Sequence, residues 1–300
     1  MRGKVRFSAP GKVIISGEHS VVYGRHALVT AVSLRCHVTV EEGEKLEICS
    51  RLGITGIDFE VHPYVSMAVL VLEEKFGRFA DRPRIKIESE IPIASGLGSS
   101  AAVTVASLGA LSRFYELDLS RDEIFELAKE VELRVQGKAS GVDPFVSTYG
   151  GGWLMPEKSR VEFDAEMLVV DSGESSVTAE MVKKVAELRE DMKDVVEKIF
   201  DSMDAITLKI KESLEKRDDR LRDLFRMNHC MLKAIGVSTP ELDRIVDKLE
   251  SLGLAAKLTG AGGGGCVLAV GDRNSIEGAF SSFKKAIMLR PEKEGLREEV

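Results

Sequence analysis

Hydrophobic and polar residues partly alternate in the first third of the chain, in short runs rich in Val, Ile, Thr and Leu. A period of two is typical of β-strands with one buried face. The pattern predicts strands at residues 4–9, 13–16, 27–32, 37–41, 46–49 and 84–88, with one helix at about 63–76 among them. We therefore expect a sheet in this part of the chain.

From residue 99 onward the hydrophobic period becomes that of an α-helix. One face of the first predicted helix collects small and apolar residues, namely Ala101, Val105, Leu108 and Leu111. Ser120 and Glu123 have the spacing of a capping box, in which two side chains satisfy free backbone N–H groups at a helix N-terminus. A second helix should follow, with an apolar stripe at Ile124, Leu127, Ala128, Val131 and Val135.

The second half of the chain is predicted to be richer in helices. Thr178 can cap a long amphipathic helical region that runs to about residue 215, and further helices are expected at 218–235, 240–253 and about 275–287. Strands are expected at 167–171, 255–258 and 266–270 and near the end of the chain. A β-rich half joined near 155–166 to a helix-rich half with a small antiparallel sheet is an α+β pattern, which excludes a TIM barrel and a simple bundle.

Composition narrows the class of protein without naming a function. The 300 residues are 44% hydrophobic and 30% charged, which is typical of a folded globular chain with two domains or one large one. Lys and Arg number 42 against 49 Asp and Glu, which leaves a net charge of −7. An acidic chain argues against a dedicated nucleic-acid binder, so local loops must bind any anion.

Cysteine usage and hydropathy predict a cytoplasmic protein with no membrane partner. The cysteines form no CxxC pair, which argues against a zinc site and a disulfide framework; they are Cys36, Cys49, Cys230 and Cys266. No apolar run approaches the roughly 20 residues that span a bilayer, and the N-terminal segment lacks the core of a signal peptide. We expect reduced thiols.

The segment from Pro92 to Ala102 has the sharpest chemical pattern, because it lies between a predicted strand and the small-residue helix. Its glycines let the backbone approach a ligand, amides at a helix N-terminus can hold phosphate oxygens, and a serine hydroxyl can bind Mg²⁺. The alternative is a serine that only caps the helix. The segment also fits the permissive dinucleotide-binding pattern G-x-G-x-x-A, but a helix is predicted where the second strand of that fold should come.

A second glycine-rich loop lies between Leu258 and Cys266. A strand follows it, and too few residues remain for a dinucleotide-binding domain. The loop is either a tight hairpin or a surface that packs against a phosphate loop or a substrate. Other polar residues each fit a surface or turn position when taken alone; they are Lys12, Glu18, His19, Glu132 and Asp143.

Taken together, three segments in this order resemble the motifs of the GHMP kinase superfamily, and the match spans the whole chain. The segments are residues 10–24, 92–102 and 257–266. The form Gly17-Glu-His-Ser-Val-Val-Tyr-Gly24, with Ser140-Gly-Val-Asp143 further on, is most similar to the mevalonate kinase branch. Residues 136–139, Gln-Gly-Lys-Ala, depart from the His-Gly and proline of many members, and the short chain resembles the archaeal and bacterial form.

The resemblance implies an α+β fold of two domains. Residues 1–160 would form a ribosomal-protein-S5-domain-2-like α/β domain with the ATP site, and residues 161–300 a ferredoxin-like α+β domain with the second glycine loop. It also implies ATP as co-substrate, Mg²⁺ as cofactor and a homodimer.

The resemblance further implies phosphorylation of the C5 hydroxyl of (R)-mevalonate by ATP, a reaction that depends on positioning and charge neutralisation. Asp143 would take the hydroxyl proton or orient the hydroxyl, and Lys12 would stabilise charge on the γ-phosphate. Ser100 and Glu132 would hold Mg²⁺. The ATP phosphates would lie against Pro92, Ser95, Gly96, Leu97, Gly98, Ser99, Ser100, Ala101 and Ala102. The substrate would lie against Glu18, His19, Ser140, Gly141, Gly262 and Gly263.

Three other functions stay open on the sequence alone. A kinase of the same fold that phosphorylates phosphomevalonate or a sugar would need a different acceptor pocket, with extra Arg or Lys for a second phosphate. A non-catalytic relative that only binds a ligand would not be expected to keep Lys12, Ser100, Glu132 and Asp143 together. A nucleotide-dependent oxidoreductase would bind NAD and need no Mg²⁺.

Overall fold

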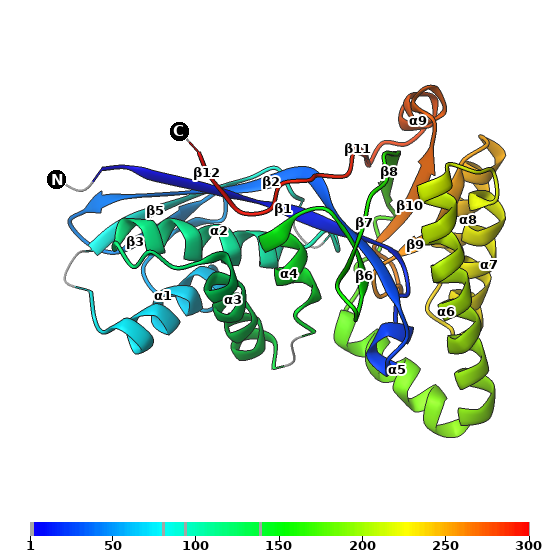
Figure 1. The fold of residues 1–300 in the computed structure, drawn as a ribbon, viewed down its shortest axis with the longest axis horizontal. Helices are drawn as coiled ribbons and strands as arrows, with labels where there is room; N and C mark the ends of the chain where they lie inside the picture. Colours follow the sequence, from blue (N-terminus) through cyan, green and yellow to red (C-terminus); the bar gives the residue numbers. More distant parts are fainter. Residues whose placement is uncertain (1–2, 80–81, 93–94, 138–139, 300) are drawn as a thin grey trace.

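The computed structural model describes residues 3–79, 82–92, 95–137 and 140–299, which form two sheets with helices packed against them. Ile93, Ala94, Lys138 and Ala139, which belong to the predicted motifs, lie outside the described residues. Figure 1 shows the first sheet running along the long axis of the molecule, with the second sheet and its helices at one end.

The first sheet has the order β12-β1-β2-β5-β3-β4, and the β6–β7 hairpin is attached to β2. Its strands are β1 (Val5–Ser16), β2 (Ala27–Gly43), β3 (Glu47–Ser50), β4 (Gly53–Thr55), β5 (Arg82–Ser89), β6 (Gly152–Met155), β7 (Ser159–Val161) and β12 (Arg297–Glu299). The strands predicted separately at 4–9 and 13–16 are one strand, β1. A register shift between Pro10 and Gly11 lets the β1–β2 ladder continue past the proline, which cannot donate a backbone hydrogen bond.

Four helices cover one face of this sheet (Figure 1): α1 (Pro63–Phe76), α2 (Ser99–Phe114), α3 (Arg121–Gln136) and α4 (Val142–Tyr149). The predicted capping box of α3 is present, with Ser120 and Glu123 each bonded to the other's backbone. Helix α4 was not predicted, because Asp143-Pro144 has the pattern of a turn. A proline is tolerated there since it falls in the first helical turn, where N–H groups have no intrahelical partner.

The second sheet is antiparallel, as predicted, with the order β11-β8-β10-β9. Its strands are β8 (Glu166–Asp171), β9 (Ala255–Thr259), β10 (Cys266–Gly271) and β11 (Ala286–Leu289), and its helices are α5 (Thr178–Asp191), α6 (Lys193–Lys216), α7 (Leu221–Ala234), α8 (Pro240–Ser251) and α9 (Arg273–Phe280). The predicted long helix breaks at Met192, and Thr178 is its first helical residue rather than its cap. The helix predicted to reach about 287 ends at Phe280, because the following apolar run pairs with β8.

Successive residues of the second sheet point into two different cores, as a strand period of two requires. Met167 and Leu268 join the core shared with the first sheet, whereas Leu168 and Ala269 join the core that also contains buried residues of α6 and α8. The last strand, β12, returns to pair with β1. The predicted domain boundary near 160 stays a prediction.

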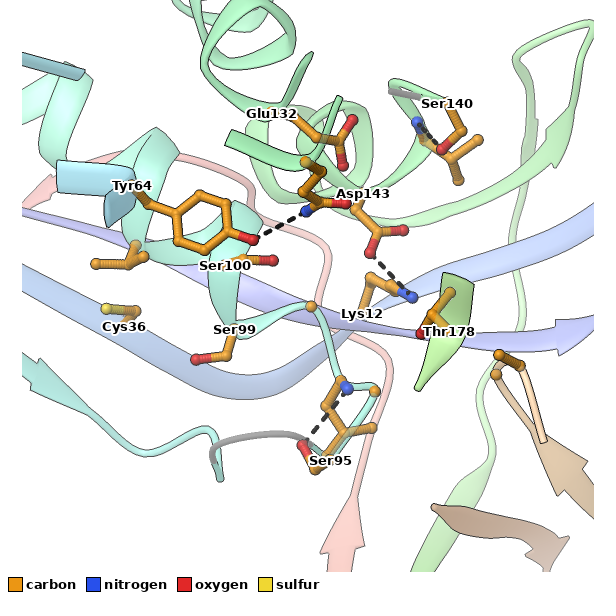
Figure 2. Close-up of a pocket in the computed structure, with 18 of the residues that line it drawn as sticks. Lys12, Cys36, Tyr64, Ser95, Ser99, Ser100, Glu132, Ser140, Asp143 and Thr178 are labelled. Atoms are coloured by element: carbon orange, nitrogen blue, oxygen red, sulfur yellow. Dashed lines mark hydrogen bonds and ion pairs between the residues drawn. The ribbon is translucent and has the colours of Figure 1, made fainter. Parts of the chain in front are cut away.

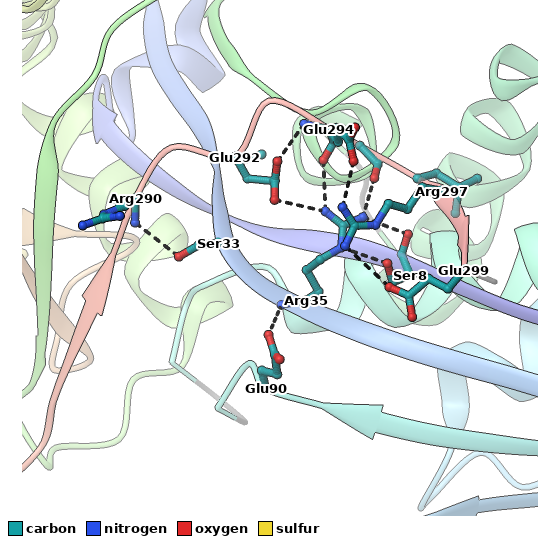
Figure 3. Close-up of polar contacts among 12 residues, drawn as sticks. Ser8, Ser33, Arg35, Glu90, Arg290, Glu292, Glu294, Arg297 and Glu299 are labelled. Atoms are coloured by element: carbon teal, nitrogen blue, oxygen red, sulfur yellow. Dashed lines mark hydrogen bonds and ion pairs between the residues drawn. The ribbon is translucent and has the colours of Figure 1, made fainter.

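A buried arginine fastens the C-terminal segment to the first sheet (Figure 3). Arg35 on β2 donates hydrogen bonds to the Ser8 hydroxyl at 2.8 Å and to the Gly295 carbonyl oxygen at 2.6 Å. Glu292 lies 3.5 Å from the same guanidinium. These contacts fasten Glu292 and Gly295 to β1 and β2, and Leu296 packs in the same core as Cys36.

No helix in the described part of the chain is long and apolar enough to cross a membrane. The four cysteines are free thiols, as predicted. Burial raises the pKa of Cys36 and of Cys266 to about 12, so both thiols stay protonated.

Candidate active site

A cleft of about 1560 Å³ lies over the first sheet and reaches from α1 to the beginning of α5. Its described lining brings together most of the residues that the sequence singled out: Lys12, Glu18, His19, Ser95, Gly96, Leu97, Gly98, Ser99, Ser100, Glu132, Ser140 and Asp143. Figure 2 shows several of these side chains around one space, from β1, α2, α3 and α4. Residues 131 positions apart in the sequence, such as Lys12 and Asp143, thus meet in one site.

A lysine–aspartate ion pair lies in this cleft. Lys12 follows the irregular step of β1, and Asp143 is in the first turn of α4. The Lys12 ammonium lies 3.1 Å from Asp143 Oδ2 (Figure 2). The lysine side chain is 7% exposed and the aspartate 27%, so one carboxylate edge remains open to a ligand.

The phosphate loop is held directly against β1 by glycines. The Lys12 N–H donates to the Leu97 carbonyl oxygen at 2.9 Å. A Cβ at Gly11 would lie 2.6 Å from that same oxygen, and a Cβ at Gly98 would lie 2.8 Å from Lys12 Cγ. Gly98 has φ 75° and is the N-cap of α2, so its conformation also favours glycine. The positive end of α2 therefore lies beside Lys12, where it can hold an anion.

The predicted phosphate segment does not face the cleft along its whole length. Ala101 and Ala102 are buried, and the Ala102 N–H already donates to the Gly98 carbonyl oxygen at 3.0 Å. Pro92 has no N–H group and accepts a hydrogen bond from the Ser95 hydroxyl at 2.9 Å. The described residues of this segment that line the cleft are Ser95 to Ser100.

Glu132 on α3 is a largely buried carboxyl in the same cleft. Burial and the neighbouring Asp143 raise the pKa of Glu132 to about 7, against the opposing effects of the Gly141 N–H and Lys12. The Gly141 N–H donates to Glu132 Oε2 at 3.3 Å. The described residues contain no cluster of three or more His, Cys, Asp or Glu side chains suited to a metal ion. Two carboxyls with one lysine nevertheless leave an excess of negative charge, which a cation would neutralise.

Glu18 and His19 lie after the end of β1, before the short 3₁₀ helix η1 (Ser20–Tyr23). The Glu18 carboxylate forms an ion pair with Lys257 of β9, and His19 Nε2 lies 2.8 Å from the Ala261 carbonyl oxygen. Burial lowers the pKa of His19, which favours the neutral ring. Sequence reasoning gave Lys257 no role. The signal that could have drawn attention to Lys257 is its position in the apolar strand Ala255–Thr259, which is buried throughout, because an unpaired lysine is rarely buried.

The second glycine loop packs mainly against protein. A Cβ at Gly262 would overlap the Val237 carbonyl oxygen, and one at Gly263 would lie 2.5 Å from Met181 Sδ. The described lining of the cleft contains Gly260 and Ala261 rather than these two glycines. The substrate contact of Gly262 and Gly263 stays a prediction. Gly141, also predicted to bind substrate, is the N-cap of α4.

Comparisons with known proteins identify the family of the chain. The model of the GHMP kinases N terminal domain matches residues 63–151, and that of the GHMP kinases C terminal domain matches residues 210–287. The mevalonate kinase of Archaeoglobus fulgidus is 50% identical over 294 residues, which cover 97% of this chain and 99% of that protein. The mevalonate kinase of Thermococcus gammatolerans is 38% identical and covers 99% and 98%.

Solved structures show the same likeness. The Methanococcus jannaschii mevalonate kinase has a TM-score of 0.80 at 30% identity, with 96% of this chain and 98% of that chain covered. The L. major mevalonate kinase, solved in complex with R-mevalonate, has a TM-score of 0.82 at 28% identity, with 98% and 97% covered. A Lactococcus lactis galactokinase, at 17% identity and a TM-score of 0.80, shares the fold alone.

The fold and the two matched domains define a two-domain GHMP kinase, a class that uses ATP. The predicted α+β architecture is therefore confirmed. Within this class, the chain belongs to the mevalonate kinase family.

Proposed function

We propose that this chain transfers the γ-phosphoryl group of ATP to the C5 hydroxyl of (R)-mevalonate, giving 5-phosphomevalonate and ADP. The observation that carries the proposal is the Lys12–Asp143 pair, 3.1 Å apart at the N-terminal end of α2. This pair would supply a proton acceptor and a cation beside a helix end suited to an anion, which are the parts that phosphoryl transfer needs.

The chemical step follows from these positions. The C5 oxygen attacks the γ-phosphorus, a new O–P bond forms, and the bond from the γ-phosphorus to the bridging oxygen breaks, with its electron pair leaving on ADP. Asp143 accepts the hydroxyl proton, or orients the hydroxyl while the proton leaves later. Lys12 can contact both Asp143 and an oxygen of the moving phosphoryl group, and so stabilises the charge that develops there.

The donor set of Ser100 and Glu132 fits Mg²⁺. Both residues line the cleft and offer oxygen donors, which this hard cation prefers. Burial and the neighbouring Asp143 raise the pKa of Glu132 despite Lys12, so a further cation beside this carboxyl would be favourable. When bound, Mg²⁺ neutralises charge on the β- and γ-phosphates.

The two ends of the cleft suit the two substrates. Beyond Ser99 the cleft continues to apolar and aromatic residues beside α1, where Tyr64 accepts a hydrogen bond from the Gln136 side chain at 3.0 Å (Figure 2). We expect the adenine here and the phosphates at residues 95–100. The acceptor then lies on the other side of Lys12, toward Glu18 and His19.

The carboxylate of mevalonate needs a cation, and Glu18 would repel it. Lys158, on the turn between β6 and β7, lines the cleft and forms no ion pair within the described residues. Its ammonium lies 4.7 Å from the centre of the Phe145 ring, in cation–π contact. We therefore assign Lys158 to the substrate carboxylate, and Glu18 to a hydroxyl.

A coupled assay of ADP release tests the function. Mg²⁺-ATP is supplied with mevalonate, phosphomevalonate, galactose or homoserine in turn. We expect turnover with mevalonate alone. Turnover with another acceptor would keep the kinase and overturn the acceptor assignment, whereas silence across the panel with intact ATP binding would favour a ligand-binding relative.

The homodimer is proposed from the resemblance alone. All the groups assigned above come from one chain, so the proposed chemistry does not depend on a second copy. Sedimentation velocity at assay concentrations would measure the state, and a monomer would refute this part of the proposal.

A further inference from the structure

Lys257 is a buried lysine for which the chemistry above has no use. It lies in β9 with an exposed fraction of 0%, and its neighbours Ala256 and Leu258 point into the core that also contains residues of α7 and α8. The Lys257 side chain therefore points to the opposite face, toward β1. Its ammonium pairs with Glu18 Oε1 and donates to the Leu258 carbonyl oxygen at 2.7 Å.

Its partner, Glu18, is only half satisfied. The glutamate side chain is 1% exposed, yet it borders the cleft. Its second oxygen, Oε2, is buried and has no hydrogen-bond partner among the described residues. A buried carboxylate oxygen without a donor is costly, so a donor from the cleft would be favourable. The neighbouring His19 cannot serve, because its Nε2 is engaged with the Ala261 carbonyl oxygen.

We propose that Lys257 is a positioning residue for the acceptor: it fixes Glu18 Oε1 and keeps the group ionised, so that Oε2 accepts a hydrogen bond from a substrate hydroxyl other than the one phosphorylated. This inference rests on the proposed function and names how the acceptor is held. A carboxylate only accepts hydrogen bonds, whereas the protonated acid also donates, so the charge sets which group fits.

Other charged groups around the pair do not replace Lys257. His229 on α7 has Nδ1 3.4 Å from the Leu258 nitrogen and Nε2 3.1 Å from Asp243 of α8, and burial lowers the pKa of His229. Lys233 lies 2.7 Å from Asp243, and Lys12 is paired with Asp143. Burial lowers the pKa of both His19 and His229, and among the described residues Lys257 is the cation that pairs with Glu18.

The test is Lys257→Met, with the Michaelis constants for both substrates measured from about pH 6 to about pH 9. Without the ammonium, the buried Glu18 takes up a proton, since burial disfavours an unpaired charge. We expect the KM for mevalonate to rise about 10- to 100-fold at neutral pH, as for loss of a hydrogen bond to a charged group. The rise should shrink as the pH increases and Glu18 ionises, while kcat and the KM for ATP stay within about threefold of wild type.

Two further variants separate positioning from a merely structural role. Arg35→Met removes a different buried cation, which lies in the first sheet, is 4% exposed and is outside the described lining of the cleft. This variant should lower stability without changing the KM for mevalonate. The double variant Lys257→Met/Glu18→Gln removes both charges of the buried pair. It can therefore replace the single variant in this test if Lys257→Met fails to fold. It should show the raised KM of Glu18→Gln with no pH dependence.

Equal changes in both Michaelis constants, or a pH profile like that of wild type, would overturn the role of Lys257. So would a wild-type KM for mevalonate in Glu18→Gln. A wild-type protein that does not turn over mevalonate refutes the proposed function instead, before any variant is made.

Discussion

Two glycine-rich loops line one cleft, but they use their glycines in opposite ways. In residues 95–98, a Cβ on Gly96 would have no atom of a described residue beyond its chain neighbours within 4 Å, and a Cβ on Gly98 would lie 2.8 Å from Lys12 Cγ. In residues 260–265, Gly262, Gly263 and Gly264 press against other segments of the chain. The first loop lines the cleft with both of its glycines, whereas most of the second loop packs against protein.

The following element explains the difference in chemistry. The first loop ends in α2, whose first N–H groups have no intrahelical partner and can hold an anion. The second loop ends in β10, whose N–H groups are used in the sheet. Its contribution to the site is indirect, since the Ala261 carbonyl oxygen orients His19. Glycine content alone therefore does not distinguish the two loops. The difference comes from the helix that follows the first loop and the strand that follows the second.

The largest expected effect comes from removing the cation beside the first loop. Lys12→Met should lower kcat by roughly 10²–10⁴-fold, because the charge on the transferred group loses its stabilisation. The melting temperature should change little. Lys209→Met, which removes an exposed lysine paired with Glu212, is the matched control and should keep full activity. A Lys12 variant with wild-type kcat would place the chemistry elsewhere.

The second prediction tests the packing of residues 260–265 against the rest of the protein. Gly262→Ala should lower the free energy of unfolding by about 2–4 kcal/mol, because a Cβ at φ 74° overlaps the Val237 carbonyl oxygen, a backbone atom that cannot move alone. Urea unfolding followed by circular dichroism measures it. If the free energy of unfolding changed as little as at an exposed glycine, the close packing of residues 260–265 against protein would be contradicted.

The third prediction concerns the stabilisation of the protein by Mg²⁺ at Glu132 of α3, which should depend on pH. The folded-state pKa of Glu132, about 7, lies above its ordinary 4.5, so stability is lost as the pH rises from about 4.5 through 7. The loss is about 1–2 kcal/mol once partial exposure is allowed for. Mg²⁺ with a non-hydrolysable ATP analogue should therefore raise the melting temperature more at pH 8 than at pH 5. In Glu132→Gln this difference should disappear, and its persistence would exclude Glu132 as a ligand.

The smallest change in stability is expected at Gly96, in the loop of residues 95–98. Gly96→Ala adds a Cβ into empty space, so only the unfavourable φ of 73° is felt, at about 1 kcal/mol. Measured beside Gly262→Ala, it gives the cost of backbone conformation without collision. Equal costs at the two positions would remove the contrast between the loops.

Much of the fold could be predicted from local patterns. The capping box of α3, the small-residue face of α2 and the antiparallel second sheet all follow from residue type and period. Errors occurred where tertiary pairing decides between states. The apolar run Ala286–Leu289 became a strand because β8 offers a partner, and α4 forms across a proline that suggested a turn.

The candidate site was predictable as a set of residues but not as a geometry. Lys12, Glu132 and Asp143 each fit a surface position when taken alone, and only the order of three motifs, at residues 10–24, 92–102 and 257–266, pointed to a kinase. Nothing local indicates that Lys257 reaches Glu18 from 239 residues away, because a long-range ion pair leaves no sequence period. The packing of Gly262 on Val237 is hidden in the same way.

We propose that phosphoryl transfer takes place between residues 95–100 and the Lys12–Asp143 pair. The most direct test of this proposal is the single-turnover rate of 5-phosphomevalonate formation by Asp143→Asn, at saturating Mg²⁺-ATP and mevalonate. We predict a rate roughly 10²–10⁴-fold below wild type, with folding and ATP affinity unchanged. A folded variant that forms product at the wild-type rate would contradict the assignment of Asp143 and the account built on it.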